Sequence, residues 1–557
     1  MKMEQPRPEQ RFWLVFVGFA ALVLLAASTS WILAHPYAVQ WDEASYFNQA
    51  LTSIWRVHTG TLRQIVGVLL GSGDSTRPPA YRVLVLPFLW LFGLHIAAAR
   101  FSSLALSCLS AAFLFSATRR VASPAAGAFA LFVFLLSPEV VASSIFFSTE
   151  APLFLATSAM LYFLFVFWSG GNRPADWIGL GLAVALGLLS KTSFVLIAGP
   201  VFIFALIVSF RSKPRVTGPA FLFKAGALAA LVAVPWWVRN IGPALHYASY
   251  ARDWTRSSLG TPSLLTWGRW FNTVLQGLLG HGVSILIGLV VIFALRKAIF
   301  RRQTLFDPLQ KTALLACACA GLPLIVVQLS GTNHLLRHIS PVVIPLAITV
   351  GVLAETTGWL YSKLALAVSG VLLVAQLVMI VGPVLSPNRS ALEPKFVNSN
   401  GGVPWRAMIR FDQWDWTPLR EISHNCGLET PKIALLGNGR GLNEAQISYF
   451  WVVEGATSPE VTWLWRYEQG PLDWQQVNSA IDSSDIVLTA PNYVGDVTDK
   501  QDVDNQHNAE FAERLAHDSR FRGPVSLKMG RFEPVEVTVF LRKSLVCGPA
   551  QKVQSQP

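Results

Sequence analysis

The sequence predicts a polytopic α-helical membrane protein of about eleven spans, in a range of 11–13, followed by a C-terminal soluble α/β domain. Of the 557 residues, 52% are hydrophobic and only 14% are charged, and the mean hydropathy is +0.45. Soluble proteins carry more charge than this. Apolar runs close to the ~20 residues that cross a bilayer recur from Phe12 to about Leu385. Beyond about Ser386 the composition becomes that of a soluble protein.

The candidate spans are, in order, 12–34, 101–118, 124–138, 150–168, 177–190, 194–210, 219–237, 278–295, 311–329, 338–354 and 363–385. They predict a membrane domain over 1–387, whose first outer loop is 35–100, and an extracytoplasmic domain over 388–557. Segment 81–96 is apolar but short, and we predict that it lies in or dips into the outer interface.

Basic residues set the predicted orientation, because short loops rich in Lys and Arg remain in the cytoplasm. Such residues precede the first span and then fall at every second loop: Lys2, Arg7 and Arg11; Arg119 and Arg120; Arg173; Arg211, Lys213 and Arg215; Arg296, Lys297, Arg301 and Arg302; and Lys363. We therefore expect a multi-pass protein of the cell inner (plasma) membrane with its N-terminus in the cytoplasm and its C-terminal domain outside.

This topology also explains the net charge of +12 and the pI near 9.6. The basic residues form separate loop clusters instead of one stripe, so no nucleic-acid partner is expected. Two cysteines, Cys426 and Cys547, lie in the outer domain. In an oxidising compartment they either form a disulfide or remain free thiols, and the sequence leaves both alternatives open.

An acidic pair, Asp42 and Glu43, follows Trp41 in the first outer loop. As structural residues, Asp42 would cap a helix and Glu43 would complement the helix dipole. As functional residues, they would place negative charge beside the bilayer because a reaction or a ligand requires it there. The helical spacing of Tyr46, Phe47, Ala50, Leu51 and Ile54 predicts an amphipathic helix whose apolar face rests on the bilayer.

Glu150 is a second candidate carboxylate on the outer side, although Ser148-Thr149-Glu150-Ala151-Pro152 is also an ordinary way to begin a helix. Arg77 is the best-placed outer cation, because Pro78 and Pro79 stiffen its backbone. The other candidates near outer span ends are Arg100, Lys191, Arg239, Arg337 and His338. Any single one of them is expected to snorkel to lipid headgroups, whereas several around two or three acids suggest an anion site.

These segments resemble the GT-C superfamily of integral membrane glycosyltransferases. The first carriers of the resemblance are Trp41-Asp42-Glu43-Ala44-Ser45-Tyr46-Phe47 and Arg77-Pro78-Pro79-Ala80-Tyr81. Later matches are Leu91-Phe92-Gly93 with Arg100, Thr149-Glu150-Ala151-Pro152-Leu153, Gly187-Leu188-Leu189-Ser190-Lys191, Pro235-Trp236-Trp237-Val238-Arg239-Asn240 and Arg337-His338-Ile339-Ser340-Pro341. The most similar branch holds protein O-mannosyltransferases and the aminoarabinose transferases that modify lipid A.

The resemblance implies an inverting glycosyltransferase that moves a sugar from a polyprenyl-phosphate carrier to a lipid, glycan or protein acceptor on the outer face. Asp42 matches the catalytic acid and Glu43 its neighbour, with Glu150 as a further acid. Arg77, Lys191 and Arg337 match positions near the carrier phosphate. Two residues depart from the family pattern, since relatives often carry Asp at the position of Glu150 and Tyr at that of His338.

No metal is required by these residues, because Arg77 neutralises much of a phosphate's charge; a divalent ion between Asp42 and Glu150 is left open. The alternative functions are a membrane transporter and a non-catalytic cell-envelope scaffold. A transporter is expected to carry broken spans and polar residues near the bilayer midplane, whereas most spans here are apolar through the middle.

Overall fold

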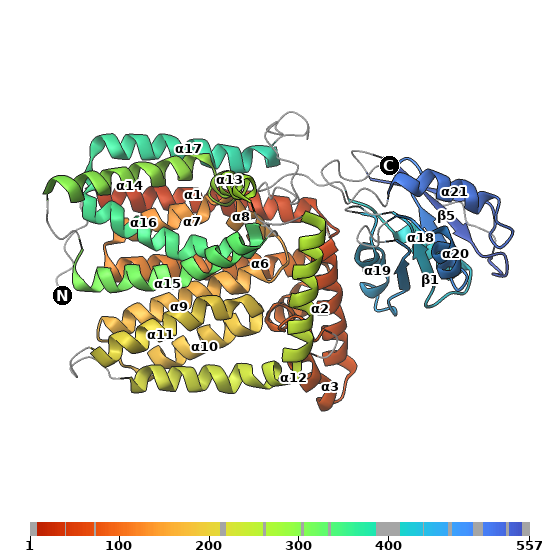
Figure 1. Cartoon of the computed structure of the whole chain (residues 1–557), viewed down its shortest axis with the longest axis horizontal. Helices are drawn as coiled ribbons and strands as arrows, with labels where there is room; N and C mark the ends of the chain where they lie inside the picture. Colours follow the sequence, from red (N-terminus) through yellow and green to blue (C-terminus); the bar gives the residue numbers. More distant parts are fainter. Residues whose placement is uncertain are drawn as a thin grey trace.

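The computed structural model describes residues 8–38, 41–71, 74–211, 219–259, 263–301, 306–331, 336–385, 413–437, 439, 441–465, 471–493, 505–530 and 534–548. Figure 1 shows a helical bundle with the N-terminus at one end and a small domain containing a β-sheet at the other. The bundle helices are α1 (Pro8–Ala34), α6 (Ile96–Val121), α7 (Pro124–Leu135), α9 (Glu150–Trp168), α10 (Pro174–Ser190), α11 (Val195–Arg211), α12 (Ala220–Leu259), α14 (His281–Arg301), α15 (Pro308–Ser330), α16 (Val343–Thr357) and α17 (Lys363–Leu385).

These bundle helices follow the predicted spans in order. Among the described residues, nine helices are long and apolar enough to cross a membrane, or ten if the bent pair of α7 and α8 (Pro138–Ile145) counts as one span. The remaining predicted span is α10, whose 17 residues reach the lower end of the length that crosses a bilayer. The fold class predicted from composition is therefore confirmed.

Short helices lie at the end of the bundle that faces the sheet domain. They are α2 (Trp41–Thr59), α3 (Leu62–Leu69), α4 (Ala80–Leu84), α5 (Leu86–Phe92), α8, α13 (Leu264–Thr273), η1 (Thr192–Phe194), η2 (Val274–Leu278), η3 (Leu336–His338) and η4 (Ser340–Val342). In Figure 1, α2 and α3 run across the bundle axis. The apolar stretch Ala80–Phe92 is too short to cross the bilayer, in keeping with the predicted interfacial helix.

The bend between α7 and α8 is 69° and has an identifiable cause. Pro138 lacks an N–H and cannot continue the hydrogen-bond ladder of α7. The carbonyl of Leu136, just beyond the end of α7, accepts a hydrogen bond from Gln376 Nε2 of α17 at 3.2 Å, and Ser137 Oγ donates to the carbonyl of Leu278. Both partners come from other elements of the bundle, so the break is satisfied internally, as hydrocarbon surroundings require.

The apolar face of α2 is buried by protein, and the expectation that it rests on the bilayer was wrong. Tyr46, Phe47, Ala50, Leu51 and Ile54 are all at most 8% exposed and belong to one core with residues of the sheet domain. The contacting helix is α19 (Glu444–Val452), and Asn48 Nδ2 donates to the carbonyl of Ala445 at 3.0 Å. The sequence shows that α2 has an apolar face, but the partner of that face lies about 400 residues away.

The sheet domain contains a mixed five-stranded sheet in the order β2-β1-β3-β5-β4. Strands β1, β2 and β3 are parallel, and β5 pairs antiparallel with β3 and β4. Its elements are α18 (Thr417–Asn425), β1 (Lys432–Leu435), α19, β2 (Glu460–Trp463), α20 (Trp474–Ile481), β3 (Ile486–Thr489), α21 (Asn508–Ala516), β4 (Val525–Met529) and β5 (Val535–Leu541). The proposed domain boundary near 387 lies outside the described residues.

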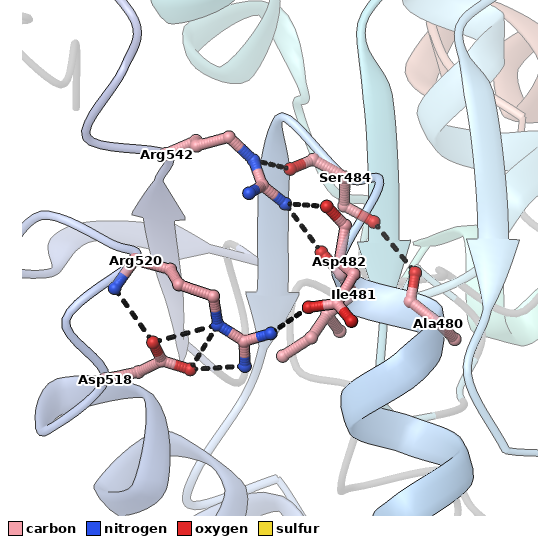
Figure 2. Close-up of polar contacts among 7 residues, drawn as sticks. All are labelled: Ala480, Ile481, Asp482, Ser484, Asp518, Arg520 and Arg542. Carbon is pink, nitrogen blue, oxygen red and sulfur yellow. Dashed lines mark hydrogen bonds and ion pairs between the residues drawn. The ribbon is translucent and has the colours of Figure 1, made fainter.

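Two arginines hold the end of α20 against the sheet, as Figure 2 shows. Arg542 Nε donates to the carbonyl of Ser484 at 2.6 Å, and its Nη2 donates to the carbonyl of Ile481 at 2.8 Å. Arg520 pairs with Asp482, which directly follows α20, and with Asp518 at 2.6 Å. Carbonyls at the end of a helix lack partners within the helix, and Arg542 supplies them.

The two outer cysteines form a disulfide that joins Cys426, at the end of α18, to Cys547 beyond β5. Close by, the N–H of Gly548 donates to the carbonyl of Asn425 at 2.9 Å. Of the two alternatives that the sequence left open, the structure has the bridged one.

Candidate active site

A pocket lies where α2, α8, the start of α9 and η3 meet, at the end of the bundle that faces the sheet domain. Its empty volume is about 290 Å³. The lining residues are Asp42, Glu43, Tyr46, Glu139, Ser143, Phe146, Phe147, Ser148, Glu150 and Arg337. The pocket therefore brings together the three carboxylates predicted from the sequence and one of the predicted cations.

Asp42 and Arg337 form an ion pair across the pocket. Asp42 stands in the first turn of α2, where a negative charge is favoured, while Arg337 belongs to η3, almost 300 residues further along the chain. Burial raises the pKa of Asp42, but the nearby charges of Arg337 and Arg77 outweigh burial and hold this pKa below its ordinary value. Asp42 is thus ionised at neutral pH and can accept a proton.

Arg77 lies beside the pocket and is held by aromatic rings. Its guanidinium lies 5.1 Å from the ring centroid of Tyr46, which lines the pocket, and 5.7 Å from that of Tyr247 in α12. Asp74 fixes the preceding turn, since its Oδ1 accepts from the N–H groups of Thr76 at 2.9 Å and Arg77 at 3.1 Å. Sequence reasoning missed Asp74, although Asp two residues before Thr is a pattern typical of such a turn.

Glu43 makes a fully buried ion pair with Arg100 of α6. Arg100 donates from Nε to Oε1 and from Nη2 to Oε2, both at 2.8 Å. The same guanidinium donates to the carbonyl of Tyr37 at 2.9 Å and to that of His35. The pair therefore fixes the start of α2 against α6, and Arg100 stands behind the pocket instead of lining it.

Glu150 begins α9 and pairs with Lys191, which follows α10, at 2.8 Å. Thr149 Oγ1 lies 3.3 Å from Glu150 Oε1. His338 follows Arg337 in η3, and burial together with Lys191 and Arg337 holds its pKa well below the ordinary value. His338 is consequently neutral at pH 7 and adds no charge to the site.

Arg239 is a predicted cation that the structure does not bring to the pocket. It is exposed on α12 and contributes nothing to the lining. Its neighbours have structural contacts: Trp237 Nε1 donates to the carbonyl of Leu188 at 3.2 Å, and Asn240 Nδ2 donates to that of Leu70 at 3.0 Å. These contacts join α12 to α10 and to the segment that follows α3.

Sequence reasoning also missed Glu139, a fourth carboxyl group in the pocket. Its position could have identified it, because Glu139 directly follows Pro138 at the outer end of the predicted span 124–138. Within the part of the chain that the structure describes, no group of three or more His, Cys, Asp or Glu residues is arranged to hold a metal ion. The expectation about metals is not tested by this finding.

Comparison with known proteins places this geometry in a class. A family profile described as dolichyl-phosphate-mannose-protein mannosyltransferase matches residues 76–238, which include Arg77, Glu150 and Lys191. The structure of ArnT from Cupriavidus metallidurans bound to undecaprenyl phosphate is similar with a TM-score of 0.56 and 14% identity, over 96% of this chain and 99% of that chain. Arabinofuranosyltransferase AftD from Mycobacteria is similar with a TM-score of 0.50 and 13% identity, over 96% of this chain and 40% of that chain. No curated protein matches by sequence.

Together these findings define an integral membrane protein with the GT-C fold, and the resemblance predicted from the motifs is confirmed. Within that class, the fold extends over nearly the whole length of ArnT, while the match to the mannosyltransferase family covers the segment from the Arg77 loop to α12.

Proposed function

We propose that the protein is an inverting glycosyltransferase that moves a sugar from a polyprenyl-phosphate carrier to a lipid, glycan or protein acceptor at the outer face of the inner membrane. The observation that carries the proposal is the ionised Asp42 paired with Arg337 in a pocket at one end of the bundle. An acid and cations at one end of a bundle of apolar helices support a reaction on a charged group that a membrane-embedded carrier presents there. In the solved ArnT structure the bound molecule is undecaprenyl phosphate.

In the proposed reaction Asp42 takes the proton from an acceptor hydroxyl group, whose oxygen attacks the anomeric carbon of the sugar. As that bond forms, the bond from the anomeric carbon to the phosphate oxygen breaks, and the polyprenyl phosphate leaves with its negative charge. One displacement of this kind inverts the configuration at the anomeric carbon.

Cations around the pocket would stabilise the departing phosphate. Arg77 and Arg337 each carry a planar guanidinium with five N–H donors, so Arg337 can contact a phosphate while it remains paired with Asp42. Lys191 adds a third positive charge beside Glu150. Because the pocket is partly shielded from water, these charges act more strongly there than in solution.

We further propose that the reaction needs no added metal ion. Asp42, Glu43 and Glu150 already have cation partners from the chain itself, namely Arg337, Arg100 and Lys191. Prolonged EDTA treatment followed by dialysis should then leave at least half of the transfer rate. A loss that Mg²⁺ or Mn²⁺ restores would contradict this proposal.

The first test is transfer of radiolabelled sugar from a panel of polyprenyl-phosphate sugars to candidate acceptors by the purified protein in nanodiscs. Asp42→Asn removes the base and should lower the rate by at least about a hundredfold, and Arg77→Ala should weaken use of the carrier. Arg63→Gln, an exposed cation of α3, is the matched control. Folded protein with no turnover of any donor would favour a transporter or a scaffold.

A further inference from the structure

Glu139 occupies a position in the pocket that the proposed reaction does not use. The break after α7 turns α8 by 69°, and this turn places Glu139 and Ser143 along one side of the pocket. Glu139 is 1% exposed. Phe146, Phe147 and Ser148 continue the same side, and these five residues are called the 139–148 wall below.

The surroundings of Glu139 differ from those of the other acids in the pocket. Asp42, Glu43 and Glu150 are each paired with a cation, whereas no ion pair is found for Glu139 among the described residues. Its Oε1 accepts a hydrogen bond from Ser143 Oγ at 3.4 Å. Its Oε2 is buried and, within the described part of the chain, has no hydrogen-bond partner.

A buried oxygen without a partner is costly, and proteins retain few such atoms. A carboxyl group at this position would gain a partner if a ligand placed a hydrogen-bond donor beside it. The remaining residues of the 139–148 wall indicate the kind of ligand. Two hydroxyl groups and two aromatic rings offer polar contacts and apolar surface together, as binding sites for small polar ligands do. A sugar presents both kinds of surface.

We propose that the 139–148 wall is the sugar subsite and that Glu139 accepts a hydrogen bond from a hydroxyl group of the sugar carried on polyprenyl phosphate. This inference rests on the proposed function and explains how the donor sugar is selected. The cations bind the phosphate, and Glu139 distinguishes one sugar from another. A site that hydrogen-bonds a substrate hydroxyl discriminates strongly against an analogue that lacks it, because the protein group is then left without a partner.

The test separates the sugar from its carrier. Binding of undecaprenyl phosphate alone, and of undecaprenyl phosphate bearing glucose, galactose or mannose, is measured for the wild type, Glu139→Leu and Glu139→Gln. The sugar-bearing carrier that the wild type prefers should bind about tenfold more weakly to Glu139→Leu. Undecaprenyl phosphate alone should bind equally to all three proteins. Glu139→Gln keeps an accepting oxygen and should stay within about threefold of the wild type.

A second readout excludes a merely structural role. Removing a buried carboxyl group whose Oε2 has no hydrogen-bond partner among the described residues should leave the thermal midpoint of Glu139→Leu unchanged or raise it. Glu355→Gln is the matched control, because Glu355 lies near the far end of α16 and pairs with Ser123 and Tyr361. If Glu139→Leu weakens both ligands equally, or neither, the sugar subsite is wrong while the proposed function stands. If the wild type binds no carrier at all, both are wrong.

Discussion

Each predicted acid of the pocket is held by a cation from a different element. Asp42 of α2 pairs with Arg337 of η3, Glu43 with Arg100 of α6, and Glu150 of α9 with Lys191 after α10. Charges in a site of low dielectric are stable only with such partners. The pairs therefore have two effects at once: they give each acid a counter-charge, and they join elements that are distant in the chain.

The ion pair of Asp42 and Arg337 predicts a change in pH dependence. The pKa of Asp42 is held below its ordinary value, so its basic form persists above that pKa and is lost as the pH falls through it. Arg337→Gln removes the largest charge effect that lowers this pKa. We expect the acid limb of the pH–rate profile to move to higher pH, together with a lower maximal rate. The measurement is the transfer rate across pH 4–9 for both proteins.

Arg63→Gln, on the exposed surface of α3, should leave the acid limb where it is in the wild type. An unchanged limb in Arg337→Gln would mean that the group titrating there is not Asp42.

The buried pair of Glu43 and Arg100 predicts a loss of stability in single variants. Glu43→Gln leaves the Arg100 guanidinium buried without its counter-charge, and the expected cost is about 3–5 kcal/mol. The double variant Glu43→Gln/Arg100→Met removes both charges and should recover part of that loss. Thermal unfolding of the four proteins in detergent gives the coupling between the two residues. Additive effects would show that the pair does not hold α2 against α6.

At the scale of elements, the sequence predicts those helices and strands whose hydrophobic pattern is visible in a short stretch of the chain. Apolar length predicted the bundle helices. In the C-terminal domain the runs 432–436, 485–489 and 536–541 have the pattern of buried strands, and they coincide with β1, β3 and β5. The strands β2 and β4, which form the two edges of the sheet, were missed, because β2 has no buried residue and β4 has both exposed and buried residues. Their places depend on neighbours that are distant in the chain.

The candidate site shows the same limit. Motifs and outward position identified Asp42, Glu150 and Arg77, but the partners of Asp42 and Glu150 depend on how remote elements pack. Arg100 and Arg239 had similar signals in the sequence, and only packing shows that one is buried with Glu43 and the other is exposed. The spacing of charged residues along the chain does not determine which residues at the ends of different spans come into contact.

The disulfide predicts a local effect on the sheet domain. It closes a segment with a separation of 121 residues, so its removal is expected to cost about 2–5 kcal/mol. In Cys426→Ser/Cys547→Ser the sheet domain should become sensitive to protease at lower temperature than in the wild type. Cys108→Ser, which removes a thiol from α6, serves as the control. Equal protease sensitivity of the two variants would show that the bridge adds little.

At the scale of the whole molecule, α2, which carries Asp42, lies at the same end of the bundle as the sheet domain, opposite the N-terminus (Figure 1). The core shared by α2, α19 and the inner face of the sheet joins the two parts. Trp41, which directly precedes Asp42, also makes a T-shaped contact with Trp463 of β2, with ring centroids 6.2 Å apart. The sheet domain thus supports the helix that carries the proposed base, and changes at their interface should alter transfer.

The positions of the basic loops predict the orientation of the protein in the membrane. Single cysteines are introduced at two exposed positions, Asn172→Cys between α9 and α10, and Glu429→Cys in the sheet domain. The loop that holds Arg173 should face the cytoplasm. In intact spheroplasts a membrane-impermeant maleimide should therefore label Glu429→Cys at once and Asn172→Cys only after permeabilisation. The parent protein gives the background from Cys108, Cys317 and Cys319, which lie in bundle helices. The opposite labelling pattern would place the pocket on the cytoplasmic side and remove the physical reason for a lipid-carried donor, since nucleotide sugars are available there.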